Sequence, residues 1–323
     1  MKKYTIALIV AFSVLFIIIL VSSDISQNRM EPGGLKIQIT PTAEKTQLAI
    51  STRIPVSEGF NGQRAFEDVK AQMDFGPRIP GSEAHTKVLD WISNEVKNAG
   101  WQVEIQNSSK MNHPIKNIIA KRGSGKPWII IGAHYDSRLW AVKDPDPENI
   151  KLPVPGAVDG ASGVAVLTEL ARSLPSGINK EIWLIFFDAE DQGGIPGWDW
   201  ILGSRVAAES LQSKPEAVIV VDMIGDADLN VYFEHNSDKT IMTQIWDQAA
   251  KLGYGSKIIA KYKYTILDDH IPFKELGIPV VDMIDFDYPY WHTTQDTLDK
   301  VSPQSLQIIG DTLWNWIQNF QSR

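Results

Sequence analysis

Short runs of almost uniformly apolar residues recur along this chain, and they restrict its fold more than any other feature. The runs lie at 128–133, 181–187, 217–221 and 280–284. A strand that is apolar on both faces has to be buried on both faces, which is typical of strands inside a parallel sheet. A sheet of this kind needs a covering layer on each side.

Helical segments separate these runs and can supply the covering layers. Ser82 and Gly100 are typical start and stop signals for one of them. Strands that alternate with helices predict an α/β fold, and we expect a single-domain three-layer sandwich whose mostly parallel, twisted central sheet carries helices on both faces. The expected helices lie at 65–73, 83–99, 162–174, 240–252 and 302–321. Further β-rich runs, expected as strands, lie at 101–106, 117–121 and 256–260.

The first 23 residues differ in character from the rest of the chain. Lys2 and Lys3 precede an apolar run at 4–21, close to the roughly 20 residues that a helix needs to span a bilayer. We expect 1–23 to be a membrane anchor or a signal peptide, with both alternatives open. Either one places the body of the protein outside the cytoplasm, anchored or secreted. Residues 24–59 are polar and predict a linker, and 60–323 form the globular domain.

Composition narrows the kinds of site that this chain can build. The formal net charge is −8, and an acidic chain has no general attraction for a phosphate backbone, so we expect no nucleic acid partner. The chain has no Cys, so a metal site has to use His and carboxylate ligands. Eleven Trp residues make a pocket with aromatic walls feasible.

Acidic residues and histidines follow the predicted strands, at the edge of the sheet where α/β proteins bind their ligands. One of them alone means little, because an Asp after a strand is more often a helix cap than a ligand. Together they form an oxygen- and nitrogen-rich set that suits Zn²⁺. The residues are His134, Asp159, Glu190, Asp191, Asp222 and His292.

Asp159, Asp191 and His292 would give a catalytic zinc its three protein ligands and leave one position open. Glu190 directly precedes Asp191, and two adjacent carboxylates cannot both point at one ion in the same way. We therefore expect Glu190 to face the substrate as a proton shuttle. Without the other residues of the set, 188–191 would be a typical solvated acidic turn.

A carboxylate also follows one of the histidines closely, in His134-Tyr135-Asp136. We expect Asp136 to orient the His134 imidazole from behind the site. An ordinary hydrogen bond at the end of a strand would give the same spacing, so a purely structural role for Asp136 stays open.

Five segments together resemble the co-catalytic zinc aminopeptidases. The ligands of that family follow the order His, Asp, Glu or Asp, Asp, His, with the general base directly before the third ligand. The resemblance covers nearly everything from residue 60 onward and implies that 60–323 is a zinc-dependent catalytic domain. The segments are 133–137, 158–163, 187–191, 221–225 and 292–293.

A closer resemblance is to the glutaminyl cyclases, which share that fold. It rests on the segments 203–205, 268–273, 277–280 and 291–293. This resemblance implies one zinc ion on the three ligands named above, although two remain possible.

The resemblance to the cyclases also implies roles for other residues. Glu190 would be the catalytic carboxylate, and Asp222 and Asp268 would act with it. These two Asp residues would share a hydrogen-bond network in the space of a second metal. Trp291 would form an aromatic wall of the substrate pocket, and Trp198 a second wall.

The chain departs from the family pattern at a few positions. Asp191 stands where both families usually have Glu, so its loop must approach the metal more closely. Leu267 stands where a polar residue is common in the animal cyclases. An aromatic residue is expected shortly before Trp291, and Tyr288 and Tyr290 are the candidates.

Two enzymatic hypotheses and one non-enzymatic hypothesis follow. The first is a glutaminyl-peptide cyclotransferase that converts the N-terminal Gln of peptides to pyroglutamate and releases ammonia. The second is a di-zinc aminopeptidase in which His134 and Asp222 complete a second metal site and Asp159 bridges the ions. The third is an anchored binding module that only keeps the fold. Both enzymes would act on peptides with a free N-terminus, and their zinc content and products would differ.

Overall fold

The computed structural model describes residues 59–126 and 128–321. The predicted N-terminal segment 1–23, and the predicted linker apart from Gly59, lie outside this part of the chain. Among the described residues, no helix has the length and apolar character needed to cross a membrane.

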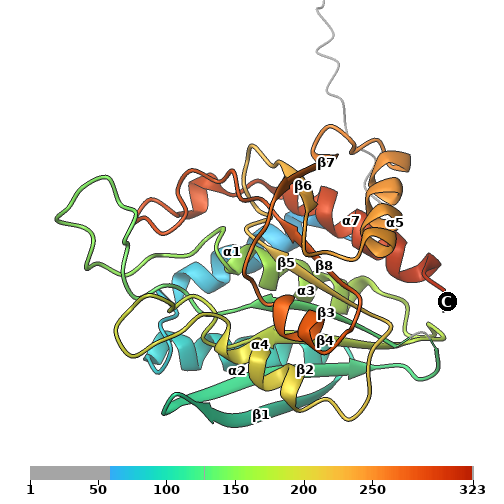
Figure 1. The fold of residues 1–323 in the computed structure, drawn as a ribbon, viewed down its shortest axis with the longest axis horizontal. Helices are drawn as coiled ribbons and strands as arrows, with labels where there is room; N and C mark the ends of the chain where they lie inside the picture. Colours follow the sequence, from blue (N-terminus) through green and yellow to red (C-terminus); the bar gives the residue numbers. More distant parts are fainter. Residues whose placement is uncertain (1–58, 127, 322–323) are drawn as a thin grey trace, which may run out of the picture. The chain divides into compact units, whose positions relative to one another are not determined.

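Six strands form the central sheet, in the order β1-β2-β4-β3-β5-β8 (Figure 1). The strands are β1 (Gln102–Lys110), β2 (His113–Arg122), β3 (Trp128–His134), β4 (Glu181–Phe187), β5 (Ala217–Asp222) and β8 (Val280–Ile284). β3, β4, β5 and β8 run parallel to one another. β1 and β2 pair antiparallel at one edge. The four parallel strands therefore all end at the same side of the sheet.

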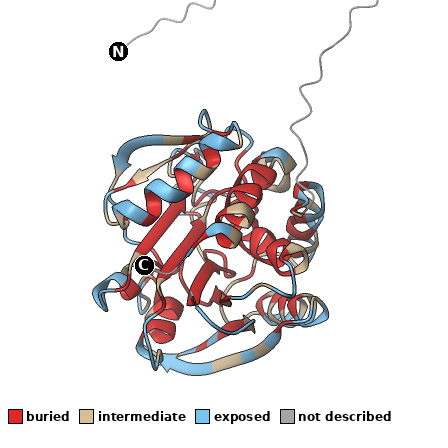
Figure 2. Cartoon of the chain, turned by 90° about the vertical axis from the view of Figure 1, so that its right-hand side faces the viewer, coloured by how far each residue is buried: buried red, intermediate tan, exposed pale blue. Residues whose placement is uncertain are grey.

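Helices cover both faces of this sheet, which confirms the predicted three-layer α/β sandwich. Inward side chains of one sheet face share a core with most of the helices. These are α1 (Gly62–Asp74), α2 (Glu83–Asn98), α3 (Ala161–Ser173), α5 (Lys239–Lys251) and α7 (Pro303–Asn319). Two short helices, α4 (Leu202–Glu209) and α6 (Ile271–Glu275), pack on the other face. Figure 2 shows the buried strands between helices whose outer surfaces are exposed.

Local sequence signals explain where helices start and how closely they pack. The Ser82 side chain accepts a hydrogen bond from His85 N at 3.1 Å, and Gly100 follows the helix with a φ of 88°. Both signals were expected for α2. In α3, a Cβ on Gly163 would lie only 2.7 Å from Val221 O. Glycine therefore lets α3 lie directly against β5.

The chain between β5 and β8 differs from the prediction. The strand expected at 256–260 exists as β7 (Ile258–Tyr264), but it pairs in parallel with β6 (Val231–Glu234) in a separate two-stranded sheet. A helix was expected between the strands 181–187 and 217–221 without defined bounds, and α4 lies there, whereas β6, α6 and the short 3-10 helix η1 (Leu298–Lys300) were not predicted. Elements of three to five residues are too short to show a clear hydrophobic period.

Candidate functional site

A pocket of about 220 Å³ opens where β3, β4, β5 and β8 end. Its polar wall consists of Asp159, Glu190, Asp191, Asp222, Asp268 and His292. Its apolar wall includes Trp200, Tyr264, Ile266, Leu267, Ile284, Phe286 and Trp291. Most of the predicted site residues therefore share one cavity. His134, Asp136 and Trp198 do not line it.

Asp159, Asp191 and His292 converge at the bottom of this pocket, as expected for ligands of one ion. His292 Nε2 lies 2.8 Å from Asp191 Oδ1 and 3.8 Å from Asp159 Oδ2. All three side chains are almost fully buried, yet Asp159 Oδ2 and Asp191 Oδ2 have no hydrogen-bond partner. Buried polar atoms without partners are costly, at about 1–3 kcal/mol each. The donor atoms lie within 4.8 Å of one another, and the set fits a zinc ion.

His134, Asp159 and Asp222 form a second group that could hold a metal. His134 Nε2 hydrogen-bonds to Asp222 Oδ1 at 3.2 Å and lies 3.0 Å from Asp159 Oδ1. Burial lowers the pKa of His134, but the carboxylates of Asp136, Asp159 and Asp222 outweigh it and hold the pKa well above its usual value. In this group His134 Nε2 contacts both carboxylates, whereas the first group keeps two buried carboxylate oxygens without a partner.

The turn after β4 is held by the buried carboxylate of Asp136. Asp136 Oδ1 accepts from Glu190 N at 3.0 Å, and Oδ2 accepts from Asp191 N at 3.3 Å and from Gln192 Nε2 at 2.9 Å. Asp136 Oδ1 also lies 3.5 Å from His134 Nδ1. The predicted proximity to His134 is therefore present, but the hydrogen bonds of Asp136 go to the turn.

Glu190 faces the pocket from this turn. Ala189 before it has a φ of 52°, and Ile201 N donates to Glu190 O at 2.9 Å. Burial raises the pKa of Glu190 well above its usual value, against the lowering effect of His134, and the neighbouring Asp191 raises it further. A carboxyl group whose pKa moves toward neutrality can both accept and return a proton.

Two residues that the sequence did not single out hold the ligand loops. Arg138 Nη1 donates to Asp191 O at 2.8 Å and lies 3.4 Å from Asp191 Oδ1. Asp296 Oδ1 accepts from Val158 N at 2.8 Å, and Oδ2 accepts from Asp159 N at 3.2 Å. Arg138 and Asp296 each lie four residues after a predicted site histidine, but in a loop this spacing does not predict a contact.

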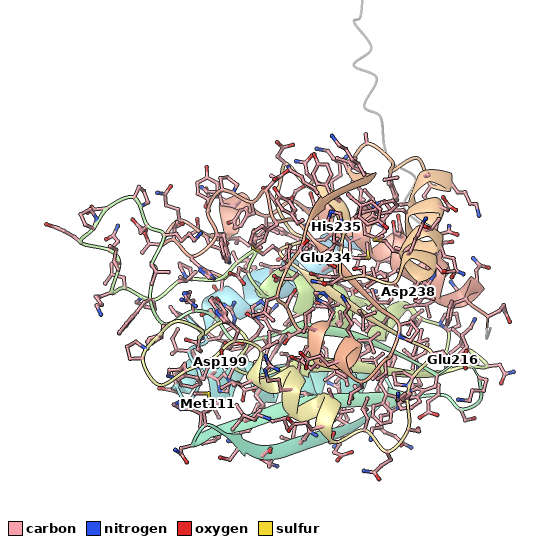
Figure 3. The ribbon with its side chains drawn as sticks, viewed as in Figure 1. Met111, Asp199, Glu216, Glu234, His235 and Asp238 are labelled. Carbon is pink, nitrogen blue, oxygen red and sulfur yellow. The ribbon has the colours of Figure 1, made fainter. Side chains whose placement is uncertain are left out.

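Trp291 lines the pocket, whereas Trp198, the second predicted wall, does not. Trp198 stacks on His113 with ring centres 3.5 Å apart and packs against a small core cluster beside β2. Figure 3 shows neighbouring Asp199 on the same side of the molecule as Met111 in the β1–β2 turn. Trp200 takes the pocket position instead, and its ring lies nearly parallel to His292 at 5.9 Å. Residues 191–197 form a series of turns and bends, so the sequence pattern does not indicate which of the two Trp residues faces the site.

Asp268 lines the pocket, but its partners differ from those expected. Among the described residues, no hydrogen bond joins Asp268 to Asp222. Asp268 Oδ1 accepts from Asp269 N at 2.5 Å, and Asp268 groups with the buried His270 and Asp282 behind the pocket wall. Burial, together with the charge of Asp222, raises the pKa of Asp268 to about 7. Asp282 comes from β8, a strand whose apolar pattern predicts only a buried core position.

The model of peptidase family M28 matches residues 117–317, which include every pocket residue named above. A glutaminyl-peptide cyclotransferase from Drosophila melanogaster is 26% identical over 277 residues, covering 72% of this chain and 75% of that protein. The solved structure of Porphyromonas gingivalis glutaminyl cyclase is 31% identical with a TM-score of 0.76, covering 80% of this chain and 98% of that chain.

An aminopeptidase is also among the relatives. Aminopeptidase YwaD from Bacillus subtilis is 30% identical over 206 residues, covering 57% of this chain and 39% of that protein. The match to the family model, the fold and the pocket residues agree with one another. The chain belongs to peptidase family M28 and is a glutaminyl cyclase-like enzyme.

Proposed function

We propose that this protein is a zinc-dependent glutaminyl-peptide cyclotransferase, which converts the N-terminal Gln of a peptide to pyroglutamate with release of ammonia. One observation carries the choice of a single metal. Asp159 Oδ2 and Asp191 Oδ2 in the first group have no hydrogen-bond partner, whereas His134 Nε2 in the second group is hydrogen-bonded to Asp222. The named cyclases among the relatives support the same assignment.

The pocket has the size and lining for one side chain. Its volume of about 220 Å³ and its walls of Trp200, Phe286 and Trp291 suit the aliphatic part and the flat amide of Gln. Zinc on the three ligands would polarise the γ-carboxamide carbonyl as a Lewis acid. The acidic wall, with Asp222 and Asp268, would hold the α-amine near that carbon.

Glu190 would carry the protons of the reaction. The α-amine nitrogen of the substrate bonds to the γ-carboxamide carbon, and the bond from that carbon to the amide nitrogen breaks. Glu190 accepts a proton from the attacking amine and returns it to the departing nitrogen, which leaves as ammonia. Its raised pKa and its position in the pocket wall suit both steps. We propose that Asp268 and Asp222 position the reacting amine.

The second candidate function is a di-zinc aminopeptidase. The grouping of His134, Asp159 and Asp222 favours it, since these residues could hold a second ion with Asp159 between the two sites. The similarity to an aminopeptidase supports it as well. In that case Glu190 would act as the base for hydrolysis of the first peptide bond.

Zinc content and product identity separate the two functions. We expect one zinc per chain, and ammonia release from a Gln-initiated peptide without release of free amino acid. Glu190→Gln should keep the zinc and lower kcat by about 10²–10⁴-fold, because only the proton transfer is lost. Two zinc ions with release of free N-terminal residues would establish the aminopeptidase. Full turnover by Glu190→Gln would remove Glu190 from the mechanism.

We also propose that the segment 1–23 exports the catalytic domain 60–323, either as an anchor or as a cleaved signal. Lys2 and Lys3 before the apolar run support this orientation. Fractionation of cells that express the full chain tests it. Recovery of the enzyme in the cytoplasm would contradict the proposal.

A further inference from the structure

Lys143 lies at the rim of the pocket, on the loop 138–155 between β3 and α3. This loop is the green one that projects at the left of Figure 1. Lys143 N donates to His292 O at 3.1 Å, and its Nζ lies 4.3 Å from the centre of the Trp291 ring. The loop therefore fixes an exposed ammonium group against a wall of the substrate pocket.

Lys143 forms no ion pair among the described residues, and the carboxylate of the adjacent Asp144 accepts hydrogen bonds from Thr294 N and Oγ1. Four other cations lie over aromatic rings in this part of the molecule, and all of them except Lys151 also have a carboxylate partner. Those ion pairs are Lys263 with Asp287, Lys300 with Asp299 and Arg138 with Asp191. Among the described residues, Lys143 makes no ion pair, and the Trp291 ring is its recorded contact. The rim thus presents a cation that an external anion can approach.

The pocket interior has the opposite character. Five carboxylates line it, so it attracts the amine of a peptide and repels a carboxylate of the same peptide. An extended peptide rises about 3.3 Å per residue, so its second and third residues leave the pocket at the rim. A carboxylate at these positions would lie outside the acidic interior, at the rim where Lys143 contacts Trp291.

We propose that Lys143 makes the enzyme prefer substrates with a carboxylate one or two residues after the N-terminal residue. This rests on the proposed function, in which the N-terminal residue occupies the pocket. An acidic side chain and the free C-terminus of a dipeptide present the same chemical group, and both would be recognised. Lys143 is a specificity residue and takes no part in bond formation.

Matched peptides measure this preference. For acidic side chains, Gln-Glu-Ala-amide and Gln-Ala-Glu-amide are compared with the neutral reference Gln-Ala-Ala-amide. For the C-terminal carboxylate, Gln-Ala is compared with Gln-Ala-amide. We expect kcat/KM to be about two- to fivefold higher for the carboxylate peptides at low salt, as for an exposed ion pair. The preference should decline toward one at high salt.

The variant Lys143→Met keeps the packing of the side chain on Trp291 and removes its charge, so it should remove the preference. Lys151→Met is the matched control. Lys151 is an exposed residue of the same loop and lies 3.4 Å from the centre of the Trp140 ring, which does not line the pocket. This variant should keep the preference. Equal preference in Lys143→Met and the unchanged protein, or a preference that salt does not affect, overturns the proposal.

Failure of the reaction and failure of this specificity are separate results. If the chain releases free Gln instead of ammonia, the cyclase assignment fails, but the ratio between acidic and neutral peptides can still be measured on that product. If no peptide is turned over, calorimetric binding of the same peptides to the zinc-loaded protein gives the ratio. Equal affinities for acidic and neutral peptides would then refute the role of Lys143.

Discussion

Replacing Asp136 by Asn should weaken zinc binding through the turn that carries Glu190 and Asp191. The Asp136 carboxylate is fully buried and accepts three hydrogen bonds, two of them from the backbone of that turn. An Asn of the same shape keeps one oxygen and presents an NH₂ group to donors on the other side. The turn then loses at least one hydrogen bond to a charged group, each worth about 1.5–3 kcal/mol.

We therefore expect Asp136→Asn to lower the unfolding free energy of the zinc-free protein by about 3 kcal/mol. Zinc affinity should fall about 10- to 100-fold, because a residue that orients a ligand typically contributes that much. Urea unfolding in the presence of a chelator gives the first quantity. Competition with a chromophoric zinc chelator gives the second.

The control for this experiment is Asp311→Asn. Asp311 is also a buried carboxylate, and it accepts a hydrogen bond from Tyr254 Oη at 2.8 Å on α7, outside the pocket. This variant should lose stability and keep its zinc affinity. If Asp136→Asn behaved in the same way, with zinc affinity within about twofold of the unchanged protein, Asp136 would only contribute to stability.

Two further predictions concern the pocket wall and pH. Trp200→Ala should raise KM about tenfold because it removes a pocket wall. Trp198→Ala should mainly lower the free energy of unfolding, by about 2 kcal/mol. Enzyme kinetics and urea unfolding measure the two effects, and the reverse pattern would contradict the assignment of Trp200 to the pocket. Burial raises the pKa of Asp285 to about 7, so the native state holds its proton more tightly than the unfolded chain. Its contribution to stability is full below pH 4 and is lost as pH rises through 7, by at most about 4 kcal/mol. Asp285→Asn should reduce the dependence of the unfolding free energy on pH between pH 5 and 8, measured by urea unfolding. An unchanged dependence on pH would contradict the role of the Asp285 proton.

The central sheet was predictable because its strands had one consistent physical requirement. β4 and β8 coincide with the predicted runs at both ends, since a strand buried on two faces must be apolar throughout. The pairing of β7 with β6 was not predicted. β7 is mostly exposed, so its residue pattern does not indicate which sheet it joins. The antiparallel placement of β1 and β2 depends on turn geometry, which the apolar pattern did not specify.

The candidate site was predictable where residues follow strands and was not where they lie in loops. Asp159, Asp191 and His292 come together because the parallel strands before them end at one edge. Trp200 could not be preferred to Trp198 without the path of the loop. Asp296 acts through its carboxylate on the backbone of a segment 138 residues away, and a contact of that kind leaves no local pattern in a sequence.

The parallel strands have a further consequence for how this protein would acquire the proposed zinc ion. His134 and Asp222 are neighbours in space but 88 residues apart along the chain, and Val158 and Asp296 are 138 residues apart. The proposed zinc ligands Asp159, Asp191 and His292 are spread over much of the catalytic domain, so this set of donors forms only when distant segments have come together. We therefore expect zinc to bind late in refolding and its capture to report on the native population.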